Sequence, residues 1–282
     1  MDVLLALGTV GRQLLNSQPK LALIQTTSDG YEDVDIEAAS ELGIWVSYAP
    51  SELTGNATSV AEFAVLLLLA AARHLREAFA SIRGSAVPPP QLGLALSGKT
   101  VCIVGLGEIG RKIIDRLRPF QMKIVATDEH PTNAPIDVTV YSADQLTSAV
   151  ADADFIVICV RADRENENLI DATILRAMKH GAILVNIARG MLIDEAALVG
   201  AVTDGQILAA GLDLLRVEPV EAKNPLLQLP QVLVTPHIAG FTDLMLDRTV
   251  TYIGQVLEDF AASKKPKSIL DAPDMPRRLL RG

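Results

Sequence analysis

Aromatic residues are scarce in this chain of 282 residues, and it has no apolar run long enough to cross a membrane. The longest apolar stretch, residues 63–72, is bounded by Glu62 and Arg73. The first residues lack the basic segment and the cleavage-like site of a signal peptide. We therefore expect a soluble α/β protein with an interior built from Ala, Val, Leu and Ile.

Positive charge is also in short supply. The formal net charge is −9, and the acidic residues are spread along the chain rather than gathered in a tail. Nucleic-acid partners need a basic face that neutralises their phosphates. A nucleic-acid partner is therefore not expected, and neither is a membrane.

Cysteine and histidine are few. Cys102 and Cys159, the only cysteines, lie in apolar strand-like runs, where a free thiol behaves as a small core residue. Reduced thiols favour a cytoplasmic protein. Three of the four histidines, His74, His130 and His180, are expected at the surface. No cluster has metal-ligand spacing, so no metal is expected.

Residues 100–128 are the most informative segment of the chain. An apolar strand, a glycine-rich turn, a helix and a second strand ending in an acid follow one another there. Gly105 permits the tight turn, Gly107 lets the backbone approach a pyrophosphate, and Gly110 lets the helix pack against the strand. The G-x-G-x-x-G spacing alone is a weak signal, but in this setting it indicates a dinucleotide site.

Two further features indicate that the dinucleotide is NAD. The amides of Glu108 and Ile109 open the helix and would face the phosphates, where the helix end is positive. The second strand ends at Asp128, roughly 20 residues after the glycines, where a carboxylate can accept the ribose hydroxyls of NAD. Asp128 would repel a 2′-phosphate, and Glu129 adds to that repulsion, so NADP is disfavoured.

The remaining pattern predicts two α/β lobes. Strand-like runs in the first 50 residues make a small lobe, and a long helix beginning near Asn56 or Thr58 continues past Arg73. Residues 84–93, which contain three consecutive prolines, read as a linker into the glycine-bearing lobe. We assign residues 1–84 and 243–282 to a substrate lobe, and residues 92–240 to a doubly wound NAD-binding domain of Rossmann type. The strand candidates are residues 3–7, 21–25, 45–48, 101–104, 123–127, 155–160, 183–186, 209–212 and 232–235.

Three polar residues follow the later strands of the second lobe: Arg189, Glu218 and His237. Ligands of parallel sheets bind outside the carboxyl ends of the strands, which favours a functional interpretation. An arginine can grip a carboxylate, a histidine can transfer a proton near neutral pH, and a nearby glutamate orients it. Taken singly, each residue also fits a turn, a loop or a strand end. Their joint placement favours an active site that reduces a 2-oxo acid with NADH.

The chain resembles the D-isomer-specific 2-hydroxyacid dehydrogenase family over about residues 21–264. This resemblance implies an NAD-dependent oxidoreductase that interconverts a small 2-oxo acid and its D-2-hydroxy acid. It also implies a flavodoxin-like substrate lobe and a homodimer formed through the NAD-binding domains. The segments that carry the resemblance are SDGYEDVD (28–35), NATSVAE (56–62), VGLGEIG (104–110), LVNIARGMLIDEAAL (184–198), AGLDLLRVEP (210–219) and TPHIAG (235–240).

The resemblance also implies a role for each matching residue. Arg189 would bind the substrate carboxylate and keto oxygen, His237 would be the general acid and base, and Glu218 would pair with it. Asp213 would lie near the nicotinamide amide. The other residues expected to line the cofactor are Thr58, Val160, Arg161, Asn166, Ile187 and Gly240. The loop of Ser28, Asp29 and Gly30 would hold the substrate carboxylate through its backbone amides.

The chain also departs from the family pattern in its first lobe. It begins later than family members usually do, so the first lobe is expected to be shortened. Asp29 takes a position that is usually apolar or small, so its carboxylate either lies near a bound anion or points away. A non-catalytic NAD-binding regulator or scaffold of the same fold is the alternative to the enzyme.

Overall fold

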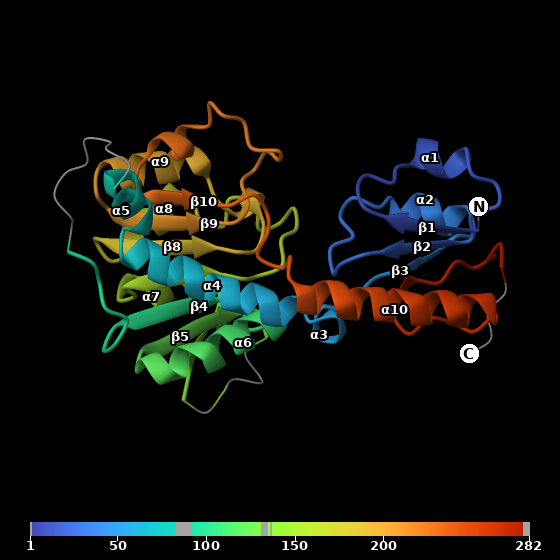
Figure 1. The fold of residues 1–282 in the computed structure, drawn as a ribbon, viewed down its shortest axis with the longest axis horizontal. Helices are drawn as coiled ribbons and strands as arrows, with labels where there is room; N and C mark the ends of the chain where they lie inside the picture. Colours follow the sequence, from blue (N-terminus) through green and yellow to red (C-terminus); the bar gives the residue numbers. More distant parts are fainter. Residues whose placement is uncertain (1, 83–91, 131–134, 136, 279–282) are drawn as a thin grey trace. The chain divides into compact units, whose positions relative to one another are not determined.

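The computed structural model describes residues 2–82, 92–130, 135 and 137–278. Contacts within the chain divide it into two compact units, residues 1–59 with 241–282 and residues 60–240. Each unit is an α/β layer structure with its own sheet (Figure 1). The α/β class and the two-lobe organisation predicted from the sequence are therefore confirmed.

The second unit is built on a seven-stranded parallel sheet with the order β10-β9-β8-β7-β4-β5-β6. The chain runs outward from β4 to β6 and then returns to the other side of β4 with β7, so the order reverses between β4 and β7. Ligands of such sheets bind at this reversal, outside the carboxyl ends of the strands. The strands are β4 (Thr100–Val104), β5 (Lys123–Asp128), β6 (Thr139–Ser142), β7 (Phe155–Ile158), β8 (Ala182–Asn186), β9 (Ile207–Leu212) and β10 (Val232–Val234).

Helices cover both faces of this sheet because alternate strand residues point to opposite sides. On one face α4 (Asn56–Ala72) and α6 (Glu108–Leu117) pack on Val101, Ile103 and Val157. On the other face α7, α8 and α9 pack on Cys102 and Ile156. The central strands are consequently mostly apolar, as a sheet buried on both sides requires. The bounds of these last helices are Leu146–Ala151, Ala172–Ala177 and Glu195–Thr203.

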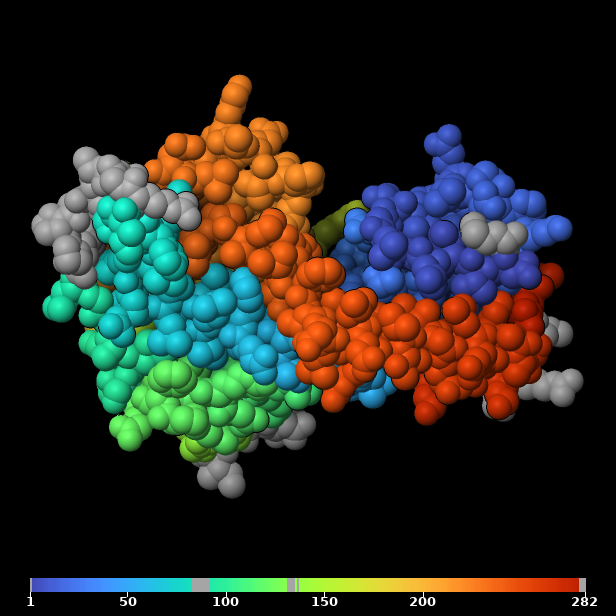
Figure 2. All heavy atoms as spheres, in the orientation of Figure 1, coloured from blue at the N-terminus to red at the C-terminus, as the bar shows by residue number. Residues whose placement is uncertain are grey.

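Helices α4 and α6 lie side by side on the face that Figure 2 shows. Arg116 of α6 donates to Glu62 of α4 at 3.0 Å across this contact. A further helix, α5 (Leu75–Ile82), follows α4, and short 3-10 turns complete the unit. These turns are η1 (Arg118–Phe120), η3 (Ala143–Gln145), η4 (Gly190–Leu192) and η5 (Pro225–Gln228).

The first unit has a four-stranded sheet with the order β1-β2-β3-β11, in which β11 is antiparallel to β3. Leu15 and Ala38, from two helices, pack on one face, while Val256 and Phe260 of α10 pack on the other (Figure 1). The strands are β1 (Val3–Ala6), β2 (Leu23–Thr26), β3 (Trp45–Ser47) and β11 (Ile269–Asp271). The helices are α1 (Arg12–Asn16), α2 (Ile36–Glu41), α3 (Ser51–Thr54) and α10 (Asp243–Ala261).

The long helix predicted past Arg73 is interrupted. α4 ends at Ala72, and His74 adopts a left-handed backbone conformation with φ of 49° before α5 begins. The surface position predicted for His74 is wrong, because the turn folds its ring inward to 6% exposure, with Nδ1 at 3.5 Å from Glu77. The predicted linker falls mostly on residues 83–91, which lie outside the described residues.

One boundary between the units differs from the prediction. The contacts group residues 60–82 with the seven-stranded sheet, whereas the sequence pattern assigned them to the substrate lobe.

Among the described residues, no single helix has the length and apolar composition to cross a membrane. α4 and α5 reach those limits only as a pair, across a bend of 61°.

Candidate active site

The glycine-rich turn lies between β4 and α6, where the order of the sheet reverses. Gly105 has φ of +106°, and a Cβ at this position would lie 2.8 Å from the backbone of Val160. A Cβ on Gly110 would lie 2.1 Å from the carbonyl oxygen of Gly105. A Cβ on Gly107 would meet nothing within 4 Å, so the space beside this residue is open to a ligand. The turn thus needs two glycines to form, while the third leaves room for close approach.

Cys159 forms a hydrogen bond to the backbone of this turn. Its Sγ donates to the carbonyl oxygen of Gly105 at 3.1 Å. Burial raises the pKa of the Cys159 thiol, so it remains a protonated donor. The other cysteine, Cys102, is fully buried in β4, where desolvation raises its pKa to about 12. Cys102 therefore has the core position predicted for it, whereas Cys159 is only partly buried and lines the cavity beside the turn.

Asp128 ends β5 beside the turn, and backbone amides fix its carboxylate. Oδ2 accepts from the amide of Leu106 and Oδ1 from the amide of His130, both at 2.8 Å. A carboxylate offers about four acceptor positions, so about two remain for a ligand. The carboxylate is therefore held in one orientation and can still accept hydrogen bonds from a ligand.

A cavity of about 330 Å³ opens between the turn and the loop after β7. Six of the residues predicted to bind the cofactor line it: Gly105, Gly107, Asp128, Val160, Arg161 and Asn166. Asn166 is held in place, since its Nδ2 donates to the carbonyl of Arg161 at 2.8 Å and its Oδ1 accepts from the amide of Asp163. The remaining cofactor candidates of this unit do not line the cavity: Glu108, Ile109, Gly110, Ile187, Asp213 and Gly240.

Arg189 follows β8 on a short segment that Asn186 organises. Oδ1 of Asn186 accepts from the amide of Ala188 at 3.0 Å, and Nδ2 donates to the carbonyl of Arg189 at 2.8 Å. The Arg189 guanidinium donates to the carbonyl of Ala188 at 2.8 Å. Ile187 lies in the same segment and is buried. A fully buried asparagine therefore sets the backbone from which Arg189 projects.

His237 and Glu218 form a pair. The Nδ1 atom of His237 lies 3.2 Å from Oε2 of Glu218. The side chains are 52% and 35% exposed, so solvent and ligands can reach the ring. Because Nδ1 faces the carboxylate, Nε2 is the nitrogen left for proton exchange.

Asp213 holds the turn that carries His237. Its buried carboxylate accepts from the Thr235 hydroxyl at 2.6 Å and from the amides of Ile238 and Ala239 at 3.0 and 2.8 Å. Its backbone carbonyl accepts from the amide of His237 at 2.8 Å. These bonds retain His237 at φ of 55°, a conformation that residues other than glycine rarely adopt. The sequence pattern did not indicate this role, because it depends on the folded backbone.

The predicted substrate loop belongs to the first unit. Asp29 Oδ2 accepts from the amide of Ser51 at 3.0 Å, so the carboxylate is turned toward the start of α3. The carbonyl of Ser28 accepts from the Thr26 hydroxyl at 2.6 Å. The amide of Gly30 donates to Ser28 Oγ over a longer 3.3 Å. Thr58, the other candidate from this unit, lies in the first turn of α4.

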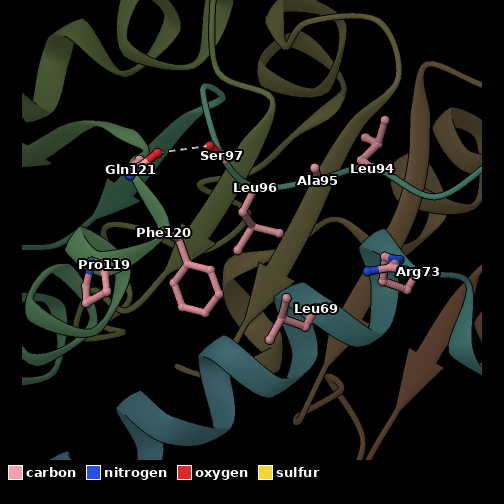
Figure 3. Close-up of a pocket in the computed structure, with 9 residues that line it drawn as sticks. All are labelled: Leu69, Arg73, Leu94, Ala95, Leu96, Ser97, Pro119, Phe120 and Gln121. Carbon is pink, nitrogen blue, oxygen red and sulfur yellow. Dashed lines mark hydrogen bonds between the residues drawn. The ribbon is translucent and has the colours of Figure 1, made fainter.

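A second cavity of about 370 Å³ lies in the same unit as the glycine-rich turn (Figure 3). Leu69, Leu96 and Phe120 line it, and Ser97 donates to Gln121 at 3.4 Å beside it. None of the predicted site residues lines this cavity. Within the described residues, no group of three or more His, Cys, Asp or Glu side chains is arranged to hold a metal ion.

These features define the class of protein. A parallel sheet, a glycine-rich turn where its order reverses and an oriented acid at the end of the next strand make a Rossmann-type dinucleotide-binding domain. Arg189, Asp213 and His237 follow β8, β9 and β10, which are neighbours in this sheet, so they share its carboxyl edge with the turn.

Comparison with known proteins identifies the family. The profile of the D-isomer specific 2-hydroxyacid dehydrogenase, NAD binding domain, matches residues 65–239. D-3-phosphoglycerate dehydrogenase of Mycobacterium bovis is 39% identical over 251 residues, covering 88% of this chain and 46% of that protein. Glyoxylate reductase of Thermococcus litoralis is 33% identical over 283 residues, covering 96% of this chain and 84% of that protein. The chain belongs to the D-isomer specific 2-hydroxyacid dehydrogenase family.

A solved structure agrees with this assignment. The NADPH-dependent glyoxylate/hydroxypyruvate reductase of Sinorhizobium meliloti, in complex with NADP and malonate, matches with a TM-score of 0.86 at 27% identity. The match covers 99% of this chain and 87% of that one. In contrast, the chain spans about half the length of the curated phosphoglycerate dehydrogenases that it matches.

Proposed function

We propose that this protein is an NAD-dependent oxidoreductase that interconverts a small 2-oxo acid and its D-2-hydroxy acid. The observation that carries the proposal is the pairing of His237 Nδ1 with Glu218 at 3.2 Å, on the same sheet as the glycine-rich turn. An oriented, solvent-accessible histidine favours an enzyme over a non-catalytic NAD-binding protein.

Arg189, Glu218 and His237 are the proposed catalytic residues. In the reductive direction, Nε2 of protonated His237 donates a proton to the oxygen formed from the keto group. Glu218 stabilises the protonated ring and fixes its orientation. Arg189 binds the substrate carboxylate and stabilises negative charge on the reacting oxygen. The bound nicotinamide supplies the hydride.

The cavity at the glycine-rich turn is the proposed NAD site, and its residues fit that cofactor. The open space beside Gly107 suits a pyrophosphate, which the N-terminal amides of α6 at Glu108 and Ile109 can bind. Asp128 is pre-oriented for the two ribose hydroxyls and would repel a 2′-phosphate. We therefore propose NAD over NADP, although one similar protein is NADPH-dependent.

Other residues complete the proposed cofactor and substrate contacts. Ser28, Asp29 and Gly30 are proposed to bind the substrate carboxylate. The long hydrogen bond from the Gly30 amide to Ser28 can be exchanged for one to a substrate anion. Asp29 is turned toward Ser51, which keeps its charge from that anion. Further residues proposed to line the cofactor are Thr58, Gly105, Gly110, Val160, Arg161, Asn166, Ile187, Asp213 and Gly240.

The organisation of the protein is proposed from the family resemblance. Residues 1–84 and 243–282 would serve as the substrate lobe and residues 92–240 as the NAD-binding domain. We propose a cytoplasmic homodimer that forms through the NAD-binding domains. Gel filtration with light scattering tests the homodimer, and an equilibrium monomer would refute it.

The test is loss of NADH absorbance with purified protein and a panel of 2-oxo acids. Glyoxylate and hydroxypyruvate come first, because they appear in the names of similar proteins. Pyruvate, phosphohydroxypyruvate, phenylpyruvate and branched 2-oxo acids complete the panel. We expect turnover that His237→Ala and Arg189→Ala each reduce by at least about a hundredfold, with NADH affinity largely retained.

Two outcomes would contradict the proposal. If turnover survived both substitutions, the assignment of the catalytic residues would be wrong. If no acid in the panel were reduced while NADH bound normally, the protein would instead be a non-catalytic NAD-binding regulator or scaffold. His180→Ala is the matched control, because this exposed histidine lines neither cavity and lies outside the proposed chemistry.

A further inference from the structure

Glu195 holds both ends of the loop that carries Glu218. Oε1 of Glu195 accepts from the backbone amide of Arg216 at 2.6 Å, and Oε2 accepts from Nδ2 of Asn224 at 3.0 Å. Glu218 lies between these two anchors in the sequence. Because Glu195 itself begins α9, whose Asp194 cap fixes its first turn, the loop is tied to a helix of the core.

The side chain of Arg216 ties the same loop to two other segments. Its Nη1 donates to Glu167 Oε1 at 2.6 Å. Its Nη2 donates to Asn168 Oδ1 and to the carbonyls of Met191 and Ile193, the latter two at 3.1 and 3.4 Å. One guanidinium therefore contacts both the loop after β7 and the segment after β8, in keeping with the fork of donors that arginine offers.

These segments are the ones on which the proposed site depends. The loop after β7 contains Asn166, which lines the dinucleotide cavity, and the segment after β8 contains Arg189. A Cβ on Gly190 would lie 2.1 Å from the carbonyl carbon of Leu215 and 2.4 Å from the amide nitrogen of Arg216. The residue after Arg189 thus packs directly on the backbone at the start of the Glu218 loop.

The position of Glu218 depends on the loop that carries it. Its side chain is 35% exposed, and the ring of His237 that it faces is 52% exposed. For partly exposed groups of this kind, the backbone of the loop sets the distance between carboxylate and ring. A displacement of about 1 Å in a catalytic pair can lower the rate by about a hundredfold.

We infer that Glu195 and Arg216 are positioning residues that hold the Glu218 loop against the Arg189 segment and so keep Glu218 at Nδ1 of His237. This inference rests on the proposed function for its kinetic consequences. It assigns neither residue a contact with substrate or cofactor. Its geometric content, the Glu218–His237 pairing, can be measured without turnover.

The kinetic test uses Glu195→Ala, which removes both anchors, and Asn224→Ala, which removes only the far one. We expect Glu195→Ala to lower kcat/KM about tenfold to a hundredfold, with the dissociation constant of NADH unchanged within about twofold. Asn224→Ala should have a smaller effect in the same direction. Arg118→Gln is the control, because Arg118 also bridges two carboxylates, Asp115 and Asp137, away from these loops.

A double substitution separates positioning from a general loss of structure. In a His237→Ala background, Glu195→Ala should lower the residual rate by no more than about twofold, because the pair that it positions is already lost. A full tenfold or larger loss in that background would overturn the inference. Arg216→Lys and Arg216→Gln extend the test, and both should slow turnover. Lysine keeps the positive charge but lacks the several donor nitrogens of the guanidinium.

The second readout is independent of activity. The nitrogen NMR signal of His237 Nδ1 is recorded at one fixed pH, and His237→Ala identifies it among the signals of the four histidines. Glu218→Gln should change the chemical shift of Nδ1, because an amide replaces the carboxylate that this atom faces at 3.2 Å. Glu195→Ala should change the chemical shift in the same direction, and Arg118→Gln should leave it unchanged.

Failure of the proposed function can be distinguished from failure of the positioning inference. If the wild-type protein reduces no 2-oxo acid, the proposed function fails while the chemical shift of His237 Nδ1 still decides the inference. If Glu195→Ala leaves that chemical shift at its wild-type value, the inference is overturned whatever the activity. Should Glu195→Ala not fold, Glu195→Gln and Asn224→Ala take its place. The glutamine keeps one acceptor oxygen but turns an amide donor toward the other anchor.

Discussion

Replacing Asp213 tests how the turn that presents His237 is held. The carboxylate is fully buried and accepts from the Thr235 hydroxyl and from the amides of Ile238 and Ala239. Asp213→Ala leaves these three donors without their acceptor. An orphaned donor costs about 1–3 kcal/mol where water cannot reach it. Ala239 is 4% exposed, whereas Ile238 is 39% exposed, so the Ile238 amide can regain water.

We therefore expect Asp213→Ala to lower the free energy of unfolding by about 3 kcal/mol, mostly through the buried Ala239 amide and the partly buried Thr235 hydroxyl. With an m-value of about 3 kcal/mol per molar urea, the unfolding midpoint would fall by about 1 M. Circular dichroism during urea titration measures this shift. Asp213→Asn should lose less, because it keeps one acceptor oxygen.

The same substitution should affect turnover beyond its effect on stability. Without the Asp213 carboxylate, His237 can leave its left-handed conformation, so the ring no longer faces Glu218. We expect the rate per folded molecule to fall at least about tenfold. A variant Asp213→Ala that unfolds at the wild-type midpoint, or that is fully active when folded, would refute this reasoning.

Three other predictions follow from local contacts. Gly110→Ala should destabilise the fold by about 1–3 kcal/mol, because its Cβ would overlap the backbone of Gly105. Gly107→Ala should leave the unfolding midpoint unchanged and weaken only NADH binding, because its Cβ would meet open space. Equal effects of the two variants on stability would contradict the proposed turn. Asp128→Ala should reduce the ratio of kcat/KM for NADH over NADPH, and an unchanged ratio would show that this carboxylate does not contact the ribose. Burial raises the pKa of Asp154, but the hydrogen bond from Lys179 at 2.7 Å helps to bring it below its ordinary value. Asp154→Asn should therefore lose stability relative to wild type above about pH 4, with the difference shrinking as pH falls further, as acid-dependent unfolding measurements can check.

The strands of the dinucleotide unit could be predicted because local sequence determines them. Residues 101–104 and 155–158 are apolar throughout, as strands buried on both faces must be. β6 and β11 were not predicted, since both are partly exposed and carry polar residues, and their pairing with β5 and β3 depends on the rest of the fold. Edge strands of this kind have no strong pattern of their own.

The break after α4 illustrates a different limit. The apolar residues that favour a helix continue past Ala72, but Arg76 donates to the carbonyls of Leu227, Leu229 and Val232, at 2.7 Å for the first two. These bonds join α5 to the segment before β10 and to the first residue of that strand, more than 150 positions along the chain. The chain therefore turns at His74, and tertiary contacts override the local helical preference.

The same distinction separates the parts of the candidate site that the sequence revealed from those that it did not. Glycine spacing and polar residues after strands are local signals, and they indicated the turn, Asp128 and His237. Glu195 lies inside a segment that carried the resemblance, yet nothing local indicates that its carboxylate reaches Arg216 and Asn224, each more than 20 positions away. Because such contacts set the geometry of a site without touching its ligands, substitutions at Glu195 should alter the pairing of Glu218 and His237 while Arg189, Glu218 and His237 themselves are unchanged.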